Sequence, residues 1–482
     1  MKLFRKKIAK GIFLIVLFTI FSSCKKLVDV NPPVTGTTGV TVFDNNALAI
    51  AAITNIYANT SQLNENLGNE GISSLSVVAG LASDEISFNN SPYFQFFKQY
   101  YTNSLTSNGI QTDLWSTIYP IIFISNSAIE GLNESSKVST VVKQQLLGEA
   151  KFMRAFCYFY LVNLYGDVPI VTTTDFKANS LIPRSAKSEV YKQIISDLTD
   201  ATRLLSENYL DATLLKSTTE RVRPTKWAAM ALLARVYLYT EQWANAEMEA
   251  SNLINQTSLF NIVSLNDVFL KNSQETIWSL QPVGTGVYSN TGEGNLFILP
   301  NSGPADFQYP IYLNNNLIAS FESNDNRKYN WLNSVSVGSS KYYYAFKYKI
   351  GRDNPSTSKE YIMVFRLAEQ YLIRSEARAQ SNNISGASQD LNVIRTRAGL
   401  SNTTATTQEQ MLNAILHERQ VELFTEWGHR WLDLKRTGKI DAVMSTVTPQ
   451  KGGTWETTDQ LWPIPQSELN ANPNLVQNPG YN

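Results

Sequence analysis

Two stretches of this chain, residues 232–254 and 373–395, share one pattern of helix, short polar turn and helix. They align without gaps at a spacing of 141 residues, and Ala246 of the first stretch falls on Ala387 of the second. Small side chains at matching positions let the two helices of each pair approach closely. A repeated helix pair buries its apolar faces by stacking on neighbouring helices, so the repeat predicts a scaffold of packed helices.

Each pair resembles a tetratricopeptide helix pair, but two copies are too few for a regular solenoid. Helical patterns at residues 186–206 and 409–427 offer further packing partners, and apolar residues also recur at helical spacing in residues 45–62, 110–132 and 145–166. We therefore expect a mostly α fold, in which tetratricopeptide-like helix pairs form a scaffold and a loop-rich insertion contains a few short strands.

The loop-rich insertion is expected at residues 258–365. The segments ETIWSLQP and KYYYAFKYKI within it indicate strands, and the remainder is polar and rich in turn residues. Residues 84–109 have the same polar and aromatic character. Because loops held on a rigid scaffold carry most binding residues, we expect the ligand-binding region at about 84–109 and 258–365. Both regions would belong to a single domain spanning residues 43–482.

The start of the chain resembles the signal of a bacterial lipoprotein. Basic residues precede an apolar run, Ile12–Phe21, which is shorter than the roughly 20 residues that span a bilayer. Two serines and Cys24 follow, as in a lipobox, although Phe21 stands where leucine is preferred. We expect residues 1–23 to be a lipoprotein signal peptide, Cys24 to be lipidated, and residues 24–42 to form a lipid-anchored tether. An ordinary signal peptide is the alternative.

Charge and composition exclude several classes of function. The 41 basic and 41 acidic side chains leave no formal net charge, which argues against a nucleic-acid partner. Two histidines and two cysteines without paired spacing predict no metal site, and no nucleotide-binding glycine motif is present, so we expect no cofactor. The 23 tyrosines, 22 phenylalanines and nine tryptophans instead suit a neutral ligand, since flat rings stack on sugars and on apolar side chains.

The segment HERQVELFTEWGHRWLDLKR, residues 417–436, has the residue types of a general acid/base site. On a helix, glutamates four residues apart lie on one face and repel one another, so this face needs cations. Gly428 is expected to end the helix. We interpret the segment as a structural charge network between two helices. Its expected members are Glu418, Arg419, Glu422, Glu426, Arg430, Asp433 and Arg436.

Several segments, in their order along the chain, resemble the SusD/RagB family of outer-membrane lipoproteins from the nutrient-uptake systems of Bacteroidetes. They include GEAKFMRAFCYFYLVNLYGDVPIV, RPTKWAAMALLARVYLYTEQWANAEMEASNLI, FRLAEQYLIRSEARAQ, HERQVELFTEWGHRWLDLKRTG and LWPIPQSELNANPNLVQNPGY. The matching segments span nearly the whole sequence. The charged segment is thus similar to a framework segment of the family, which supports its structural interpretation.

The resemblance implies a non-enzymatic binding protein. It would be anchored by lipid to the outer membrane and would face the cell surface. There it would capture an oligosaccharide and deliver it to a partner, a SusC-like TonB-dependent outer-membrane transporter. A peptide or another nutrient is the alternative ligand on the same scaffold. A surface glycosidase is a third interpretation, but outside the charged segment the sequence offers no candidate pair of carboxylates for it.

The family motifs belong to the scaffold and do not transfer ligand contacts residue by residue. In the family, contacts tend to come from the loop after an early Asp-Glu pair and from the later insertion. In this chain those are residues 86–104 and 284–335, although packing in the core is the alternative role of each ring. The expected ligand-binding residues are Asn89, Asn90, Tyr93 and Phe94, with Tyr288, Asn290, Tyr329 and Trp331 opposite them.

Overall fold

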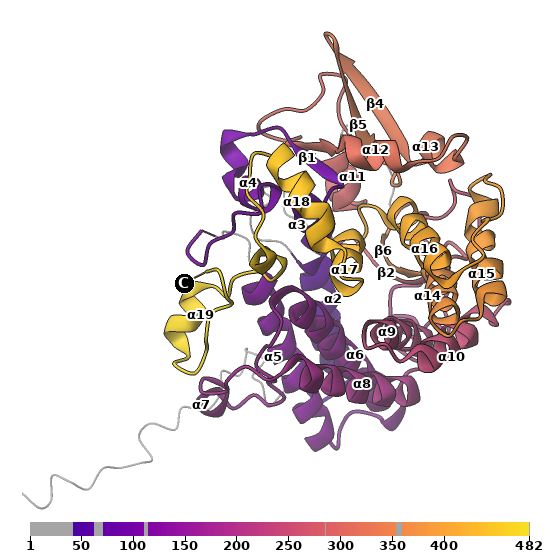
Figure 1. Cartoon of the computed structure of the whole chain (residues 1–482). Helices are drawn as coiled ribbons and strands as arrows, with labels where there is room; N and C mark the ends of the chain where they lie inside the picture. Colours follow the sequence, from indigo (N-terminus) through magenta and orange to yellow (C-terminus); the bar gives the residue numbers. More distant parts are fainter. Residues whose placement is uncertain (1–41, 62–70, 110–113, 285, 353–358, 482) are drawn as a thin grey trace, which may run out of the picture. The chain divides into compact units, whose positions relative to one another are not determined.

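The structure is a computed structural model that describes residues 42–61, 71–109, 114–284, 286–352 and 359–481. The expected signal peptide, Cys24 and all of the expected tether except Val42 lie outside these residues. Phe43–Asn482 form one compact unit, which is mostly α-helical as expected (Figure 1). In the described part of the chain, no helix combines the length and the apolar character needed to cross a membrane.

The repeated stretches form two helix pairs, as predicted. The first pair consists of α9 (Lys226–Tyr239) and α10 (Trp243–Ile254), and the second of α14 (Leu367–Gln380) and α15 (Ile384–Arg397). Within each pair the helices pack against each other, and α10 also packs against α14, so the two pairs stack directly. Ala246 and Ala387 are fully buried at the helix contacts that they were expected to permit.

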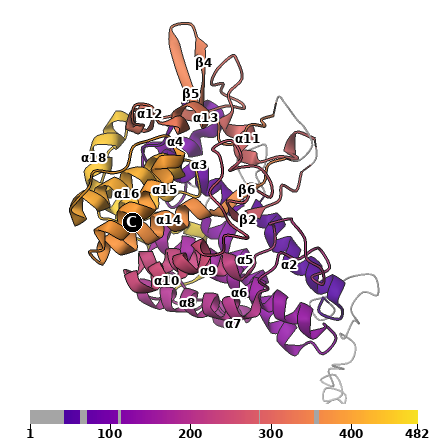
Figure 2. The ribbon, with the colours of Figure 1, turned by 90° about the vertical axis from the view of Figure 1, so that its right-hand side faces the viewer.

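Further helices extend this stack at both ends, as Figures 1 and 2 show. Before the first pair, α5 (Leu114–Glu134), α6 (Thr140–Tyr165) and α8 (Lys187–Leu204) pack in sequence, and α8 then packs on α9. After the second pair, α16 (Gln408–Leu423) packs on α14 and α15. Helix α6 is buried along nearly its whole C-terminal half, because its apolar residues occur on all sides. It therefore lies at the centre of the core.

The strands form three two-stranded antiparallel sheets within the described residues. The strands β2 (Thr276–Leu280) and β6 (Ile362–Arg366) pair at the two ends of the insertion and are buried. Strand β1 (Ile86–Phe88) pairs with β3 (Ile311–Leu313). Strands β4 (Leu332–Val337) and β5 (Ser340–Ala345) form a hairpin that projects from the scaffold (Figure 1).

The remaining short elements complete the chain. Of these, α2 packs on α5 and α6, α3 packs on α4, and α17 packs on α16, α3 and α18. Their bounds are α2 (Asn46–Ser61), η2 (Ile72–Ser74), α3 (Leu75–Ala82), η3 (Pro92–Phe94), α4 (Gln95–Tyr101), α7 (Phe176–Asn179), η4 (Gly286–Tyr288), α11 (Gly292–Phe297), α12 (Asn315–Ser320), α13 (Asn326–Asn330), α17 (His429–Arg436), α18 (Ile440–Gln450), η5 (Thr457–Gln460) and α19 (Gln466–Ala471).

Candidate functional site

The two polar, aromatic segments singled out in the sequence lie against each other. Strand β1 from the first segment pairs with β3 from the insertion, with Ile86 opposite Leu313 and Phe88 opposite Ile311. The backbone pairing continues beyond the strand, because the amide of Asn89 donates to the carbonyl oxygen of Pro310 at 2.7 Å. Residues more than 200 positions apart in the sequence therefore form one continuous surface.

Two aromatic rings stand exposed on this surface. The side chains of Tyr93, from the first segment, and Phe307, from the insertion, are each 64% exposed. Their ring centroids lie 5.5 Å apart at an interplanar angle of 88°, an edge-to-face contact. We call Tyr93 and Phe307 the aromatic platform. Large exposed apolar side chains that touch each other are the kind of feature that marks a binding surface rather than a core.

Polar groups border the aromatic platform and hold it in place. The side-chain amide of Asn89 donates to the carboxylate of Asp306 at 3.3 Å, and the hydroxyl of Ser91 donates to the carbonyl oxygen of Asp306. The Ser91 hydroxyl also accepts from the amide of Tyr93 at 3.2 Å, which caps the turn that carries the ring. Asn90 is exposed and has a φ of 54°, a left-handed conformation that asparagine tolerates.

The β4–β5 hairpin supports the insertion side of this surface. Tyr342 packs its ring edge-to-face on Tyr312, with centroids 5.1 Å apart, and both rings are half-buried. Tyr344 lies on the same face of the hairpin as Tyr342 and is buried against Leu299. Tyr343 points to the opposite face, where Lys341 lies 4.9 Å from its ring centroid. The alternation of a strand thus separates the three consecutive tyrosines.

Three of the expected ligand-binding residues are buried, and their assignment to ligand contact is corrected. Phe94 is 5% exposed and stacks on Phe97, and Trp331 is fully buried, with its indole N–H donating to the Leu265 carbonyl oxygen at 2.8 Å. Asn290 is 3% exposed, and its side-chain oxygen accepts the amides of Lys359 and Glu360. These side chains are held by the protein, so they offer no free face or polar group to a ligand.

The other expected residues lie at the surface but not all together. Asn89 and Asn90 border the aromatic platform, and Tyr93 is part of it. Tyr329 is 71% exposed on α13, which Figure 1 separates from α4 and the first segment by the β4–β5 hairpin. Tyr288 is half-buried at the end of η4. Sequence reasoning missed Phe307 and Asp306, although the segment PADFQYP, with a proline at each end, is a turn signal that could have drawn attention to them.

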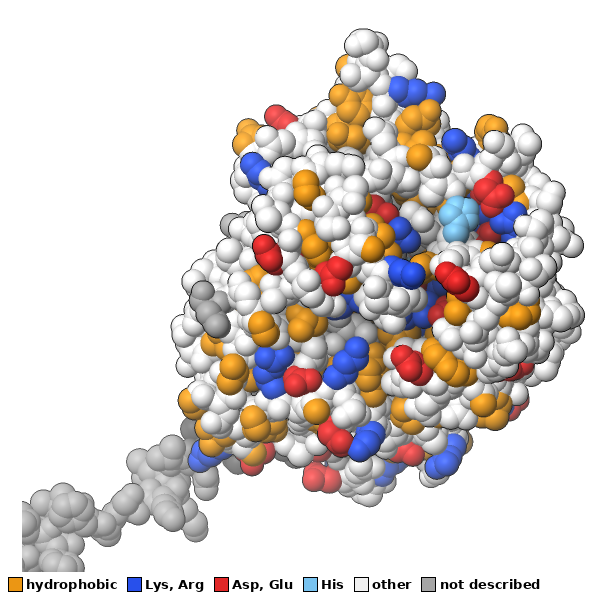
Figure 3. All heavy atoms as spheres, viewed as in Figure 1, with side chains coloured by type: hydrophobic (Ala, Val, Ile, Leu, Met, Phe, Trp, Pro, Cys, Tyr) orange, Lys and Arg blue, Asp and Glu red, His pale blue; other side chains and the backbone are white. Residues whose placement is uncertain are grey.

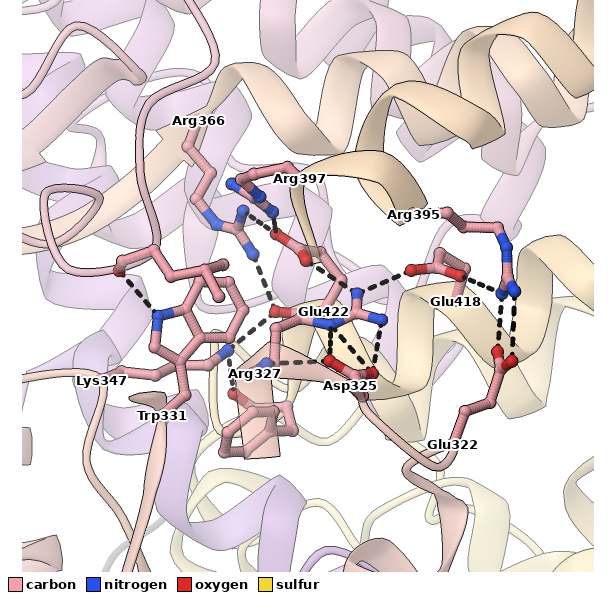
Figure 4. Close-up of polar contacts among 12 residues, drawn as sticks. Glu322, Asp325, Arg327, Trp331, Lys347, Arg366, Arg395, Arg397, Glu418 and Glu422 are labelled. Carbon is pink, nitrogen blue, oxygen red and sulfur yellow. Dashed lines mark hydrogen bonds and ion pairs between the residues drawn. The ribbon is translucent and has the colours of Figure 1, made fainter. Parts of the chain in front are cut away.

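The charged segment forms a buried ion-pair network (Figure 4). Glu422 lies at its centre, with one carboxylate oxygen 2.5 Å from Arg366, the other 3.0 Å from Arg327, and a further ion pair to Arg397. Glu418 pairs with Arg327 at 2.6 Å and with Arg395 at 3.1 Å. The glutamate face is therefore matched by cations, as the spacing required, and the predicted ion-pair network between this segment and its neighbours is confirmed.

The cations that match the glutamates differ from those expected. The arginines that are nearby in sequence pair with other acids. Arg419 pairs with Asp433 at 2.7 Å, and Arg430 pairs with Asp84 at 2.7 Å. Arg436 pairs with both Glu376 and Asp433. The helix also ends earlier than Gly428, at Leu423, and Gly428 precedes α17 with a φ of 70°. The intervening turn directs Glu426 to Arg366 and Lys347.

The electrostatics of this network suit a structural role. Burial alone would raise the pKa of Glu422, but Arg397, Arg366 and Arg327 outweigh it and hold the pKa well below its usual range. Burial, together with Arg235 and Arg419, lowers the pKa of His429 well below its usual range, so this imidazole is neutral at pH 7. A carboxylate that stays ionised beside fixed guanidinium groups is poorly suited to exchange a proton with a substrate.

The outer surface agrees with the balanced composition. On the face shown in Figure 3, acidic and basic side chains are interspersed on a surface that is mostly uncharged. Three hollows lined by described residues lie elsewhere on the chain, and none of the three includes any of the eight expected ligand-binding residues. The rings of the aromatic platform stand on the exposed surface of the protein.

Comparison with known proteins gives two matching family models. Residues 285–481 match the model of the SusD family, and residues 37–238 match a model described as starch-binding associating with outer membrane. The SusD-like protein P2 of Formosa agariphila is 28% identical to this chain over 429 residues, which cover 78% of this chain and 81% of that protein.

Solved structures share the fold. A SusD superfamily protein of Bacteroides vulgatus superposes with a TM-score of 0.76 at 21% identity, covering 90% of this chain and 99% of that one. A laminarin-binding SusD-like protein superposes with a TM-score of 0.70 at 22% identity, covering 90% of this chain and 98% of that one.

The fold and the surface together define a class: a scaffold of stacked helix pairs that carries an exposed aromatic surface on its loop-rich part. The two matched models lie on the two halves of this scaffold and span most of the chain. The chain belongs to the SusD/RagB family.

Proposed function

We propose that this protein binds a neutral oligosaccharide at the aromatic platform without cleaving it. The observation that carries the proposal is the contact between Tyr93 and Phe307, two exposed rings that come from the two segments expected to bind a ligand. Exposed rings stack on the C–H faces of sugar rings, and the neighbouring Asn89, Asn90 and Asp306 supply amide and carboxylate groups for sugar hydroxyls. The similarity to a laminarin-binding protein supports a glucan as the first ligand to test.

Binding can be tested with two ring deletions. Tyr93→Ala and Phe307→Ala each remove one exposed ring and leave the buried core untouched. Each should weaken binding by about 1–2 kcal/mol, which corresponds to roughly a five- to thirtyfold rise in Kd. Affinity electrophoresis against laminarin, starch and other polysaccharides would find the ligand, and isothermal titration calorimetry would then measure the change.

A matched control uses another exposed ring. Phe176 on α7 is 79% exposed and lies outside both segments, so Phe176→Ala should leave the Kd unchanged. Tyr329→Ala tests whether the exposed ring on α13 belongs to the same surface. A double variant, Tyr93→Ala with Phe307→Ala, that binds the polysaccharide as tightly as the wild type would refute the proposal. Binding of peptides, but of no polysaccharide, would favour the alternative ligand class.

The absence of catalysis is part of the proposal. The carboxylates of residues 417–436 are engaged with arginines and lysine in the buried network, which supports a structural role for the most acid-rich part of the chain. Incubation of the purified protein with the polysaccharide that it binds should release no reducing sugar. Release of reducing sugar by protein purified from an expression host that has no glycosidase for this polysaccharide would identify the protein as a glycosidase instead.

Anchoring and delivery complete the proposed role. Lipidation of Cys24 would hold the protein on the outer membrane, at the cell surface, beside a SusC-like TonB-dependent transporter that receives the glycan. Mass spectrometry of the mature N-terminus should find a lipid on Cys24, and Cys24→Ser should release the protein from membranes. Purification of the tagged protein from mild detergent should bring the transporter with it, and recovery of the protein alone would contradict the partnership.

A further inference from the structure

A hollow of about 770 Å³ opens on the part of the scaffold where four segments meet. It lies between the C-terminal end of α6, the start of α8, the end of α17 and the last residues of the chain. Its volume falls in the range of pockets that bind small molecules, which is roughly 300–1,000 Å³. None of the residues that form or border the aromatic platform lines it. Its charged lining consists of Asp167, Arg184, Lys187, Lys435 and Arg436.

Three of the four cations in this lining form no ion pair with a carboxylate of the described residues. Among the described residues, no acidic side chain forms an ion pair with Arg184, Lys187 or Lys435, whereas Arg436 pairs with Glu376 and Asp433. Asp167 is the one carboxylate in the lining of the hollow, and its side chain accepts the backbone amide of Lys187 at 2.8 Å.

The hydrogen bonds of these cations go to neutral groups. Arg184 donates to the backbone oxygens of Asp167, Val476 and Tyr165 at 2.7–3.2 Å and to the side-chain oxygen of Asn478 at 2.6 Å. The Lys435 ammonium donates to the backbone oxygen of Asn163. Carbonyl oxygens orient a cation but carry no net charge. The carboxylate of Asp167 favours the charged forms of Arg184 and Lys187, but one carboxylate against these three cations leaves the hollow with a net positive charge.

The positive charge of Lys435 is costly without an anion. Burial lowers the pKa of Lys435 to about 7, and the positive charge of Lys187 acts in the same direction. The buried guanidinium groups of Arg154, Arg235 and Arg327, in contrast, all have carboxylate partners. An anion in the hollow would supply the missing negative charge and would favour the protonated form of Lys435.

We propose that this hollow is a second binding site, separate from the aromatic platform, for a small ligand that carries a carboxylate, sulfate or phosphate group. Arg184, already oriented by four neutral acceptors, and the two lysines provide the positive charge that an oxyanion requires. The hollow is large enough for an acidic sugar unit, which would place its charged group against Lys187 and Lys435.

The experiment measures binding of defined oxyanions. Sodium sulfate, sodium phosphate and sodium glucuronate are titrated into the purified protein by isothermal titration calorimetry, at an ionic strength held constant with sodium chloride, and glucose serves as the uncharged probe. Lys187→Gln, Lys435→Gln and the double variant remove the cations. Lys192→Gln is the matched control, because Lys192 lies on the same helix but does not line the hollow, and it pairs with Glu189 at 2.7 Å.

We expect saturable binding of at least one oxyanion, no binding of glucose, and at least a tenfold rise in Kd in the double variant. Lys192→Gln should bind as the wild type does. Binding of glucuronate alone would assign the site to acidic sugars, and binding of sulfate or phosphate alone to an inorganic oxyanion. No saturable binding of any oxyanion, or equal affinity in the double variant, would overturn the proposal. Lys187→Gln keeps the test valid if Lys435→Gln fails to fold, since Lys187 lies at the exposed rim.

Discussion

The substitution Glu422→Gln gives the sharpest test of the buried charge network. Glu422 is fully buried, and its carboxylate faces three guanidinium groups, those of Arg327, Arg366 and Arg397 (Figure 4). The amide has nearly the same shape but no charge, so the substitution creates no cavity. The substitution removes the negative charge that the three guanidinium groups face. It also turns the amide NH₂ group, which is a hydrogen-bond donor, toward groups that are themselves donors.

The size of the effect follows from the burial of these groups. Removal of one partner from a buried ion pair costs about 3–5 kcal/mol, because the remaining charge stays out of water without compensation. The folded unit, Phe43–Asn482, has about 440 residues. An unfolding entropy of about 2 cal/mol/K per residue then converts each kcal/mol into a fall of about 1 °C in Tm. We therefore expect Tm to fall by about 3–5 °C.

Differential scanning calorimetry of the purified variant at pH 7 measures this change, and calorimetric titration with the polysaccharide ligand measures its Kd. Glu189→Gln is the control, since Glu189 forms an exposed pair with Lys192 and should alter the stability by less than about 0.5 kcal/mol. Glu422→Gln should lower Tm, while its Kd, measured at a temperature at which the variant is still folded, should stay within twofold of that of the wild type. An unchanged Tm together with lost binding would refute the structural interpretation and assign Glu422 to the ligand site.

Four further outcomes follow from single positions. Burial and the neighbouring Asp84 raise the pKa of Glu85 to about 8. The folded protein therefore loses stability as the pH rises from about 4.5 to 8, because ionisation of this buried side chain opposes folding. In denaturant titrations, Glu85→Gln should stabilise the protein at pH 8 and have little effect at pH 5. Phe94→Ala should cost about 3–5 kcal/mol of stability but retain glycan binding, because Phe94 packs in the core. Ala387→Leu should overpack the second helix pair and cost about 1–3 kcal/mol in the same assay. Gly428→Ala should cost about 1–3 kcal/mol, because its φ is 70° and the added Cβ would lie 2.8 Å from the Cβ of Ala79.

Part of the candidate site could be predicted because it depends on local composition. The aromatic and polar character of residues 84–109 and of the insertion is visible in the sequence, and the structure joins these two segments through β1 and β3. The roles of individual rings could not be read in this way. Tyr93 and Phe94 are adjacent, yet one is 64% exposed and the other 5%. Which ring faces water depends on the direction of one short turn and on the phenylalanines packed behind it.

The charge network shows the same division. The four-residue spacing of Glu418 and Glu422 requires cations on that face, whatever the rest of the fold. The spacing does not say where they come from, and the structure supplies Arg327, Arg366 and Arg397 from segments up to 95 residues away. Coulombic attraction acts between groups that the fold brings together, so neighbours in sequence such as Arg419 and Arg430 pair with other acids.

The sequence by itself determined the helical scaffold, the stacking of the repeated pairs and the family to which the chain belongs, because apolar periodicity and small residues at helix contacts are local properties of the chain. The tertiary structure alone decided which aromatic rings face solvent, which arginines neutralise the buried glutamates, and that Arg184, Lys187 and Lys435 share one hollow. These outcomes depend on contacts between segments that are distant in sequence, and burial and electrostatic balance are set only when those segments meet.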